Sequence, residues 1–276
     1  IIVRPKWLAR SIARMVLNHS SEVIAVSGPV REHLQRYGRL GDPPVRVIHN
    51  GLDPAPFDRC DDILEARQEM GAGAENVLFG VIGRIHPWKG QSYFIESARL
   101  VADKCPEAHF VIIGGTFRGY EYLLNELEKQ VNDLNLGDRL RILSHRRDVP
   151  RLMQALDVFV LPSTLPDPLP TVVLEAMAAH RPVVATAHGG AREMVLHGET
   201  GFLAPSNDVT AFAESMLELA RDDEKRRRMG EAGRRRLEEC FSRDRFFADV
   251  CDCVNHHLQL TRAAPKEKNL KAIATH

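Results

Sequence analysis

Residues 157–179, DVFVLPSTLPDPLPTVVLEAMAA, contain the pattern of a strand, a loop and a helix in direct succession. All four residues from Val158 to Leu161 are apolar, which is typical of a strand buried on both faces. Two prolines precede the helical run that begins at Thr171, and proline is compatible with a first helical turn. A buried strand followed by a helix is the repeating unit of a parallel sheet covered by helices.

The same alternation recurs along the chain, and it predicts an α/β fold, a Rossmann-like, doubly wound parallel sheet. Strands are expected at 22–27, 45–49, 76–82, 109–114, 140–144, 157–162 and 182–187. Helices are expected at 91–104, 120–134, 150–155, 171–179 and 208–221.

A break at 50–56, NGLDPAP, combines Asn-Gly with two prolines and indicates a turn or linker. Residues 1–52, with one expected helix and two strands, contain too little sequence for a core of their own, so we interpret them as the end of a preceding domain. We expect a second Rossmann domain at 53–242, then a C-terminal helix and a poorly ordered Lys-rich tail at 243–276, with a helix break near Phe241 and Ser242.

Lysine plus arginine number 37 and aspartate plus glutamate number 37, so no overall charge favours nucleic acid as a partner. No run of roughly 18 apolar residues and no leader pattern is present. We therefore expect a cytoplasmic protein that could contact the inner face of a membrane through a preceding domain. The five cysteines form no CxxC pair, and the spacing of Cys253 with His256 and His257 matches no usual zinc pattern, which favours reduced thiols.

The first candidate site lies around the start of the helix at Thr171. The amides of Leu169 and Thr171 and the dipole of the helix could bind phosphate there, with Pro170 in the first turn. Asp167 and Glu175 would bracket that phosphate, and each carboxylate can accept paired hydrogen bonds from vicinal hydroxyls. The alternatives are a helix cap for Asp167 and a solvated helix residue for Glu175.

The second candidate site is the loop after the strand at 76–82. Gly83 allows close approach of a ligand, and the cations of Arg84 and Lys89 suit a diphosphate, although a plain surface loop is an equal alternative. GxGxxG and GxxxxGK[ST] are both absent. His145, just beyond a strand end, could touch a nucleotide. The pair Gly189 and Gly190 could face a ligand through backbone amides or form a simple turn.

Taken in order, these motifs resemble the C-terminal domain of the retaining glycosyltransferases of family four, which have the GT-B fold of two Rossmann domains. The resemblance covers about 22–241 and includes the NGxD junction at 50–53. It implies that Asp167 contacts the donor sugar and Glu175 the ribose, while Arg84 and Lys89 hold the diphosphate. Asp167, Pro170 and His180 depart from the family's usual glutamate, glycine and glycine, and most of the first domain is absent.

The resemblance implies a glycosyltransferase that moves a sugar, with retention, from a UDP- or GDP-sugar to a glycan, lipid or small-molecule acceptor. We expect no required cofactor and no metal, and this chain alone could be inactive. A non-catalytic nucleotide-sugar binding remnant and a GT-B nucleotide-sugar epimerase are the alternatives. Self-association is a further expectation, because residues 1–50 would leave apolar surface uncovered. The basic, apolar segment 4–17 could lie on an anionic membrane or pack in its own domain.

Overall fold

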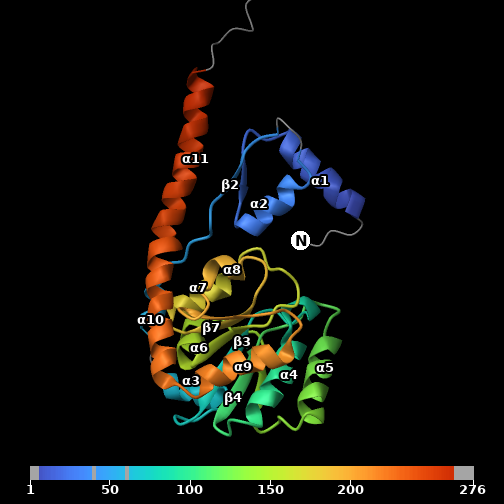
Figure 1. The fold of residues 1–276 in the computed structure, drawn as a ribbon, viewed down its shortest axis with the longest axis vertical. Helices are drawn as coiled ribbons and strands as arrows, with labels where there is room; N and C mark the ends of the chain where they lie inside the picture. The colour runs from blue at the N-terminus through green and yellow to red at the C-terminus, as the bar shows by residue number, and fades with distance from the viewer. Residues whose placement is uncertain (1–5, 39–41, 60–61, 264–276) are drawn as a thin grey trace, which may run out of the picture.

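The computed structural model describes residues 6–38, 42–59 and 62–263, and within these it contains two parallel sheets with helices around them (Figure 1). The larger sheet has six strands in the order β5-β4-β3-β6-β7-β8, and the smaller pairs β1 with β2. The predicted α/β class and the parallel sheet are confirmed. None of the described helices is both long and apolar enough to cross a membrane.

The larger sheet consists of β3 (Val77–Ile82), β4 (Ala108–Ile113), β5 (Leu140–Leu143), β6 (Val158–Leu161), β7 (Val183–Thr186) and β8 (Gly201–Ala204). The strand β8 was not predicted, because its four residues begin with glycine and show no clear period. From β3 the chain adds strands in one direction as far as β5, and from β6 it adds them in the other. The strand order therefore reverses between β3 and β6, and ligands in such sheets bind at the carboxyl ends beside this point.

Each strand of the larger sheet contributes to two hydrophobic cores, since successive side chains point to opposite faces. Phe79 and Val81 join one core with α4 (Gln91–Ala102), α5 (Tyr122–Asp133) and α9 (Val209–Ala220). Leu78 and Ile82 join the other core with α3 (Ile63–Glu69), α6 (Val149–Ala155), α7 (Thr171–Ala178), α8 (Ala191–Met194) and α10 (Asp223–Cys240). Burial on both faces explains the continuous apolar runs in the sequence.

The N-terminal part consists of α1 (Lys6–Asn18), β1 (Val23–Ala25), α2 (Gly28–Gln35) and β2 (Val45–Val47). We predicted one helix here, and this was wrong because α2 is a second one. Its first residues, Gly28 and Pro29, look like a loop in the sequence. Proline is nevertheless allowed in a first helical turn, where its missing N–H has no intrahelical partner.

The predicted helix break near Phe241 and Ser242 is confirmed, since α10 ends at Cys240 and α11 (Arg243–Ala263) begins just after it. Backbone hydrogen bonds join this break to the junction at 50–53. Leu52 donates to the carbonyl of Phe241 at 2.9 Å and accepts from the amide of Arg243 at 3.2 Å. A Cβ at Gly51 would collide with the carbonyl of Ser242, so only glycine fits there. From this junction α11 runs back past the smaller sheet (Figure 1), and the predicted tail from 264 lies outside the described residues.

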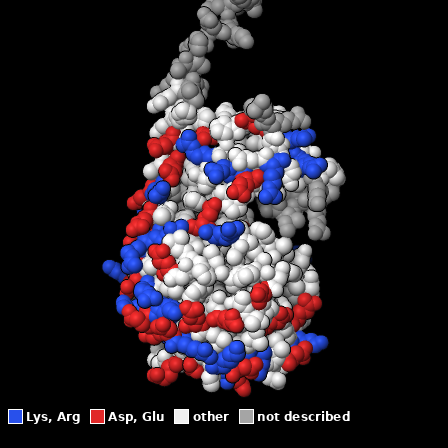
Figure 2. All heavy atoms as spheres, in the orientation of Figure 1, with Lys and Arg blue, Asp and Glu red and all other residues white. Residues whose placement is uncertain are grey.

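Charged side chains of both signs are interleaved along α10 and α11, and neither sign dominates the face shown in Figure 2. On α10, Arg227 pairs with Glu224 and Glu231, and Arg234 pairs with Glu238. Several cations of the basic runs on this helix are therefore paired with acidic residues one turn away.

We expect Arg67→Ala to lower the free energy of unfolding by roughly 3–5 kcal/mol, the usual cost of breaking a buried charged network. The guanidinium of this buried residue donates to Asp157 at 3.0 Å and to the carbonyls of Gly73, Asn76 and Ala155. These bonds connect α3 to the segments that lead into β3 and β6. Urea unfolding measures the loss, and the exposed Arg228 provides the control, because its replacement by alanine should change stability by less than about 0.5 kcal/mol.

Candidate functional site

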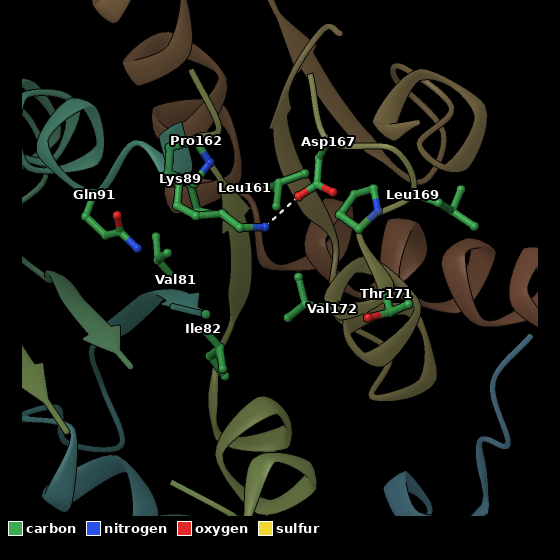
Figure 3. Close-up of a pocket in the computed structure, with 13 residues that line it drawn as sticks. Val81, Ile82, Lys89, Gln91, Leu161, Pro162, Asp167, Leu169, Thr171 and Val172 are labelled. Carbon is green, nitrogen blue, oxygen red and sulfur yellow. Dashed lines mark hydrogen bonds and ion pairs between the residues drawn. The ribbon is translucent and has the colours of Figure 1, made fainter. Parts of the chain in front are cut away.

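Two adjoining cavities open at the point where the strand order reverses, and both are lined by Ile82, Gly83 and Val172. The first, of about 220 Å³, also contains Lys89 and Asp167 (Figure 3). The second, of about 410 Å³, also contains Arg84, His145 and Glu175. A Cβ at Gly83 would meet no atom within 4 Å. The backbone of Gly83 thus faces open space between the two halves of a single site.

The ammonium group of Lys89 lies 2.5 Å from Oδ2 of Asp167 and forms an ion pair across the first cavity (Figure 3). The two side chains are 26% and 18% exposed. Lys89 ends a short 3-10 turn, Pro87–Lys89, and Gly90 follows it with a φ of 74°. A Cβ on Gly90 would collide with the carbonyl of Pro162 at the end of β6. This close approach of two loops places the cation against the carboxylate.

Gly189 and Gly190 position the loop that contains Asp167. The amide of Gly190 donates to the carbonyl of Asp167 at 2.8 Å, and a Cβ on either glycine would collide with the backbone of residues 167–169. Neither glycine lines the two cavities of the site. The amide of Gly190 is therefore used within the protein, and the pair supports Asp167 from behind.

The start of α7 borders the first cavity, as the proline pattern predicted. Leu169, Pro170 and Thr171 all line it, with Leu169 buried and Thr171 exposed. The helix begins at Thr171, so the amides of Thr171 and Val172 have no partner within the helix, whereas that of Val173 donates to the carbonyl of Pro170 at 2.9 Å. The positive end of the helix dipole therefore lies beside Lys89. At the other end of α7, His180 adopts a φ of 56°, the left-handed conformation that glycine usually supplies.

Glu175 lies one turn into α7 and borders the second cavity. Burial raises the pKa of this carboxyl group to about 7. Among the described residues, none forms a hydrogen bond or ion pair with its side chain. A desolvated carboxylate without a partner costs free energy, and a ligand that donates hydrogen bonds to it would offset that cost.

Arg84 is exposed and borders the second cavity, whereas Lys89 borders the first. Its guanidinium lies 3.8 Å from the centroid of the Phe117 ring, and its carbonyl accepts from the side chain of Gln91 at 2.8 Å. The sequence reasoning missed both Phe117 and Gln91. An aromatic residue in the glycine-rich loop after β4 was a signal for Phe117, whereas nothing in the sequence distinguished Gln91.

His145 borders the second cavity beside Gly115, where a Cβ added to the glycine would lie 3.4 Å from that of His145. The next residue, Arg146, binds both oxygens of Asp148 at 2.8 and 2.6 Å and also binds Glu69 of α3 at 2.8 Å. This bidentate network anchors the loop that contains His145. Sequence reasoning did not identify Arg146 because one of its two partners, Glu69, lies 77 residues earlier in the chain.

Replacing Glu175 by Gln should stabilise the protein at pH 8 by about 1–3 kcal/mol and change it little at pH 5. The folded-state pKa of about 7 lies above 4.5, the ordinary value of a glutamate carboxyl. The stabilising contribution of the protonated form is therefore complete below pH 4.5 and is lost as pH rises through about 7. Urea unfolding at both pH values measures the effect. A difference between the two proteins that is the same at pH 5 and pH 8 would contradict a raised pKa.

Comparison with known families supports this arrangement. The model of the glycosyl transferases group 1 family matches residues 62–236, and that of Glycosyltransferase Family 4 matches residues 3–56. The chain belongs to the group 1 glycosyltransferases. The Family 4 match ends at residue 56 and the group 1 match begins at residue 62, so the first covers the smaller sheet and the second the larger one. The predicted resemblance is confirmed.

The curated relatives that this chain matches include glycosyltransferases and a synthase whose names give different products or acceptors. The chain is 31% identical over 182 residues to an Escherichia coli UDP-Gal:alpha-D-GlcNAc-diphosphoundecaprenol alpha-1,3-galactosyltransferase, covering 64% of this chain and 46% of the relative. It is 30% identical over 247 residues to the alpha-maltose-1-phosphate synthase of Mycolicibacterium smegmatis, covering 84% and 62%. The chain spans about half the length of the curated relatives that it matches.

The solved structures that resemble this chain are GT-B glycosyltransferases. Anabaena Alr3699/HepE in complex with UDP and glucose matches with a TM-score of 0.83 and 29% identity, covering 93% of this chain and 70% of that one. The same protein has been solved with UDP-glucose, with a TM-score of 0.81. The predicted GT-B fold is therefore confirmed.

Proposed function

We propose that this chain is the donor-binding part of a glycosyltransferase that transfers a sugar from a nucleoside diphosphate sugar to an acceptor hydroxyl with retention of configuration. The observation that carries the proposal is the pair of adjoining cavities, one with the Lys89–Asp167 ion pair and one with the half-buried Glu175. Two carboxylates in linked cavities suit a ligand with hydroxyl pairs at both ends and phosphates between them. The UDP-glucose complex of Alr3699/HepE makes UDP the first nucleotide to test.

The cavities suggest a role for each residue. Glu175 would accept hydrogen bonds from the ribose hydroxyls, with the nucleobase near His145. Lys89, Arg84 and the amides at the start of α7 would hold the diphosphate. Asp167 would orient the donor sugar, and the Lys89 ammonium beside it would stay within reach of the phosphate next to that sugar.

The proposed reaction breaks the bond between the anomeric carbon and the diphosphate oxygen while the acceptor oxygen bonds to the same carbon from the same face. The departing diphosphate oxygen takes the electrons of the broken bond and accepts the proton that the acceptor hydroxyl loses. Negative charge develops on the departing diphosphate, and the cations of Lys89 and Arg84 would stabilise it in the transition state. Such fixed electrostatic groups are usually the largest contribution to catalysis.

We also propose how the chain is divided into domains, which acceptors it uses and where in the cell it works. Residues 1–52 would be the end of an acceptor-binding domain, 53–242 the donor domain, and 243–276 a helix and tail. A glycan, lipid or small molecule would be the acceptor, and the protein would work in the cytoplasm. The exposed Trp7, Ile12 and Met15 of α1 support a further contact, with the remainder of the first domain, a membrane surface or another copy of the chain.

Lys89→Ala and Arg84→Ala should each weaken UDP binding by roughly 1.5–3 kcal/mol, the value of one charge-assisted hydrogen bond. Binding of uridine should stay nearly unchanged, because both side chains are assigned to phosphate. Isothermal titration calorimetry with the two ligands measures both effects. Equal losses for uridine and UDP would show that these residues support the site as a whole and do not contact phosphate.

Transfer itself should require the remainder of the first Rossmann domain. We expect the chain to bind donor but not to release UDP from UDP-sugars at a catalysed rate, because an incomplete cleft forfeits much of the orientation contribution of about 7–11 kcal/mol. The assay follows UDP release from a panel of UDP-sugars with acceptors, with and without that remainder supplied. Efficient transfer by residues 1–276 alone would place the acceptor site within this chain.

The same assay separates the alternatives. Donor binding without transfer, even in the presence of the complete first domain, would favour a nucleotide-sugar binding protein. Conversion of one UDP-sugar into its epimer without an acceptor would favour an epimerase.

A further inference from the structure

Three side chains of the types that bind metals converge where α11 passes the smaller sheet (Figure 1). None of the three lines either of the two donor cavities. Glu22 precedes β1, whereas Cys253 and His257 lie four residues apart on α11. Residues at this spacing share one face of a helix, so both side chains point toward the same neighbour. Their ligand atoms and the carboxylate of Glu22 all lie within 4.8 Å of one another.

The carboxylate of Glu22 uses its two oxygens differently. Oε1 accepts from Nε of Arg46 at 2.8 Å. Oε2 lies 2.9 Å from Nε2 of His257 and 3.3 Å from Sγ of Cys253. The salt bridge to Arg46 therefore orients the carboxylate and leaves the other oxygen directed at the cysteine and the histidine.

Burial distinguishes this cluster from a chance group of surface residues. Cys253 is 5% exposed, and the side chain of Glu22 is 7% exposed. The side chain of His257 is 32% exposed, so the cluster is reachable from solvent on one side. A thiol, an imidazole and a carboxylate are the three ligand types that zinc prefers.

We propose that Oε2 of Glu22, Sγ of Cys253 and Nε2 of His257 bind a Zn²⁺ ion, with water as the fourth ligand on the exposed side. Zinc bonds of roughly 2.0–2.3 Å in tetrahedral geometry separate neighbouring ligand atoms by about 3–4 Å. The observed separations need only small side-chain adjustments to reach these values. On binding, the thiol of Cys253 gives up its proton to solvent, as a zinc ligand must.

Such an ion would fasten α11 to the smaller sheet. Glu22 belongs to the N-terminal part of the chain, and α11 continues from α10, which packs on the larger sheet. The zinc would link the two parts of the chain through α11, and this proposal does not depend on the proposed glycosyltransferase function. The sequence pattern is also unusual, because the carboxylate and the thiol are separated by 231 residues.

The test uses the purified full chain, stripped of metal by a chelator and titrated with Co²⁺ as a spectroscopic probe and with Zn²⁺. We expect one Co²⁺ per chain, a thiolate-to-cobalt charge-transfer band and the visible bands of a four-coordinate ion. Zn²⁺ should displace the cobalt and raise the melting temperature by roughly 5 °C or more at a hundredfold excess over its dissociation constant.

The helix provides matched controls. Cys251 and His256 are exposed neighbours of the same residue types, and Cys251→Ala and His256→Ala should bind cobalt like the original protein. Cys253→Ala should lose the charge-transfer band, and His257→Ala should weaken binding at least tenfold. Cys253→Ser keeps the size and a polar atom, so it serves if the alanine variant does not fold.

Each outcome decides the proposal. Retention of the charge-transfer band in Cys253→Ser, or its loss in Cys251→Ala, would assign the metal to another cysteine and overturn the site. A melting temperature unchanged by Zn²⁺ would also overturn it, and the three side chains would then form only the hydrogen-bonded cluster with Arg46. Donor binding by the same samples should be unaffected, which separates this result from a failure of the proposed function.

Discussion

The reversal of strand order between β3 and β6 is the constraint on which the candidate site depends. At that point the loops after two neighbouring strands diverge to opposite sides of the sheet, and a hollow remains between them. The loop after β3 supplies Lys89, and the loop after β6 supplies Asp167. Gly90 fits against the carbonyl of Pro162 only because it has no side chain, and the ion pair forms across this contact. The strand order therefore creates the cavity, and the individual side chains determine what the cavity can bind.

The two acidic residues around α7 show how environment separates chemically similar groups. Asp167 lies in a loop before the helix with a cation 2.5 Å away, so its charge is compensated. Glu175 lies within the helix against the core, where burial raises its pKa to about 7. The first carboxylate is fixed by a partner within the protein, whereas the second has its hydrogen-bonding capacity available to a ligand. This difference, more than the spacing of eight residues, supports their assignment to opposite ends of one donor.

The small N-terminal sheet is held to the larger one by polar contacts at several points. Glu193 of α8 accepts from the amide of Gly28 at 2.8 Å and pairs with His49 at 2.9 Å. The hydroxyl of Ser27 donates to the carbonyl of Pro168 at 2.6 Å, directly beside Asp167. The start of α2 therefore contacts the loop that carries the sugar-binding candidate. Each of these bonds uses the side chain of Ser27 or Glu193, so two side chains fix the N-terminal part against the loop and against α8.

The sequence by itself determined the layered α/β architecture, because continuous apolar runs such as Val158–Leu161 are stable only as strands covered on both faces. It also predicted Asp167, Glu175, Arg84 and Lys89 as site residues, because glycine and proline mark the strand ends beside which ligands bind, and the structure places all four at the two cavities. Tertiary structure alone decided that Gly190 supports Asp167, that Phe117 holds the guanidinium of Arg84, and that Glu22 meets Cys253 and His257. Local sequence determines the spacing of apolar residues and the residues that form turns, but these contacts join segments up to 235 residues apart. Their formation depends on strand order and on the path of α11, which no local pattern specifies.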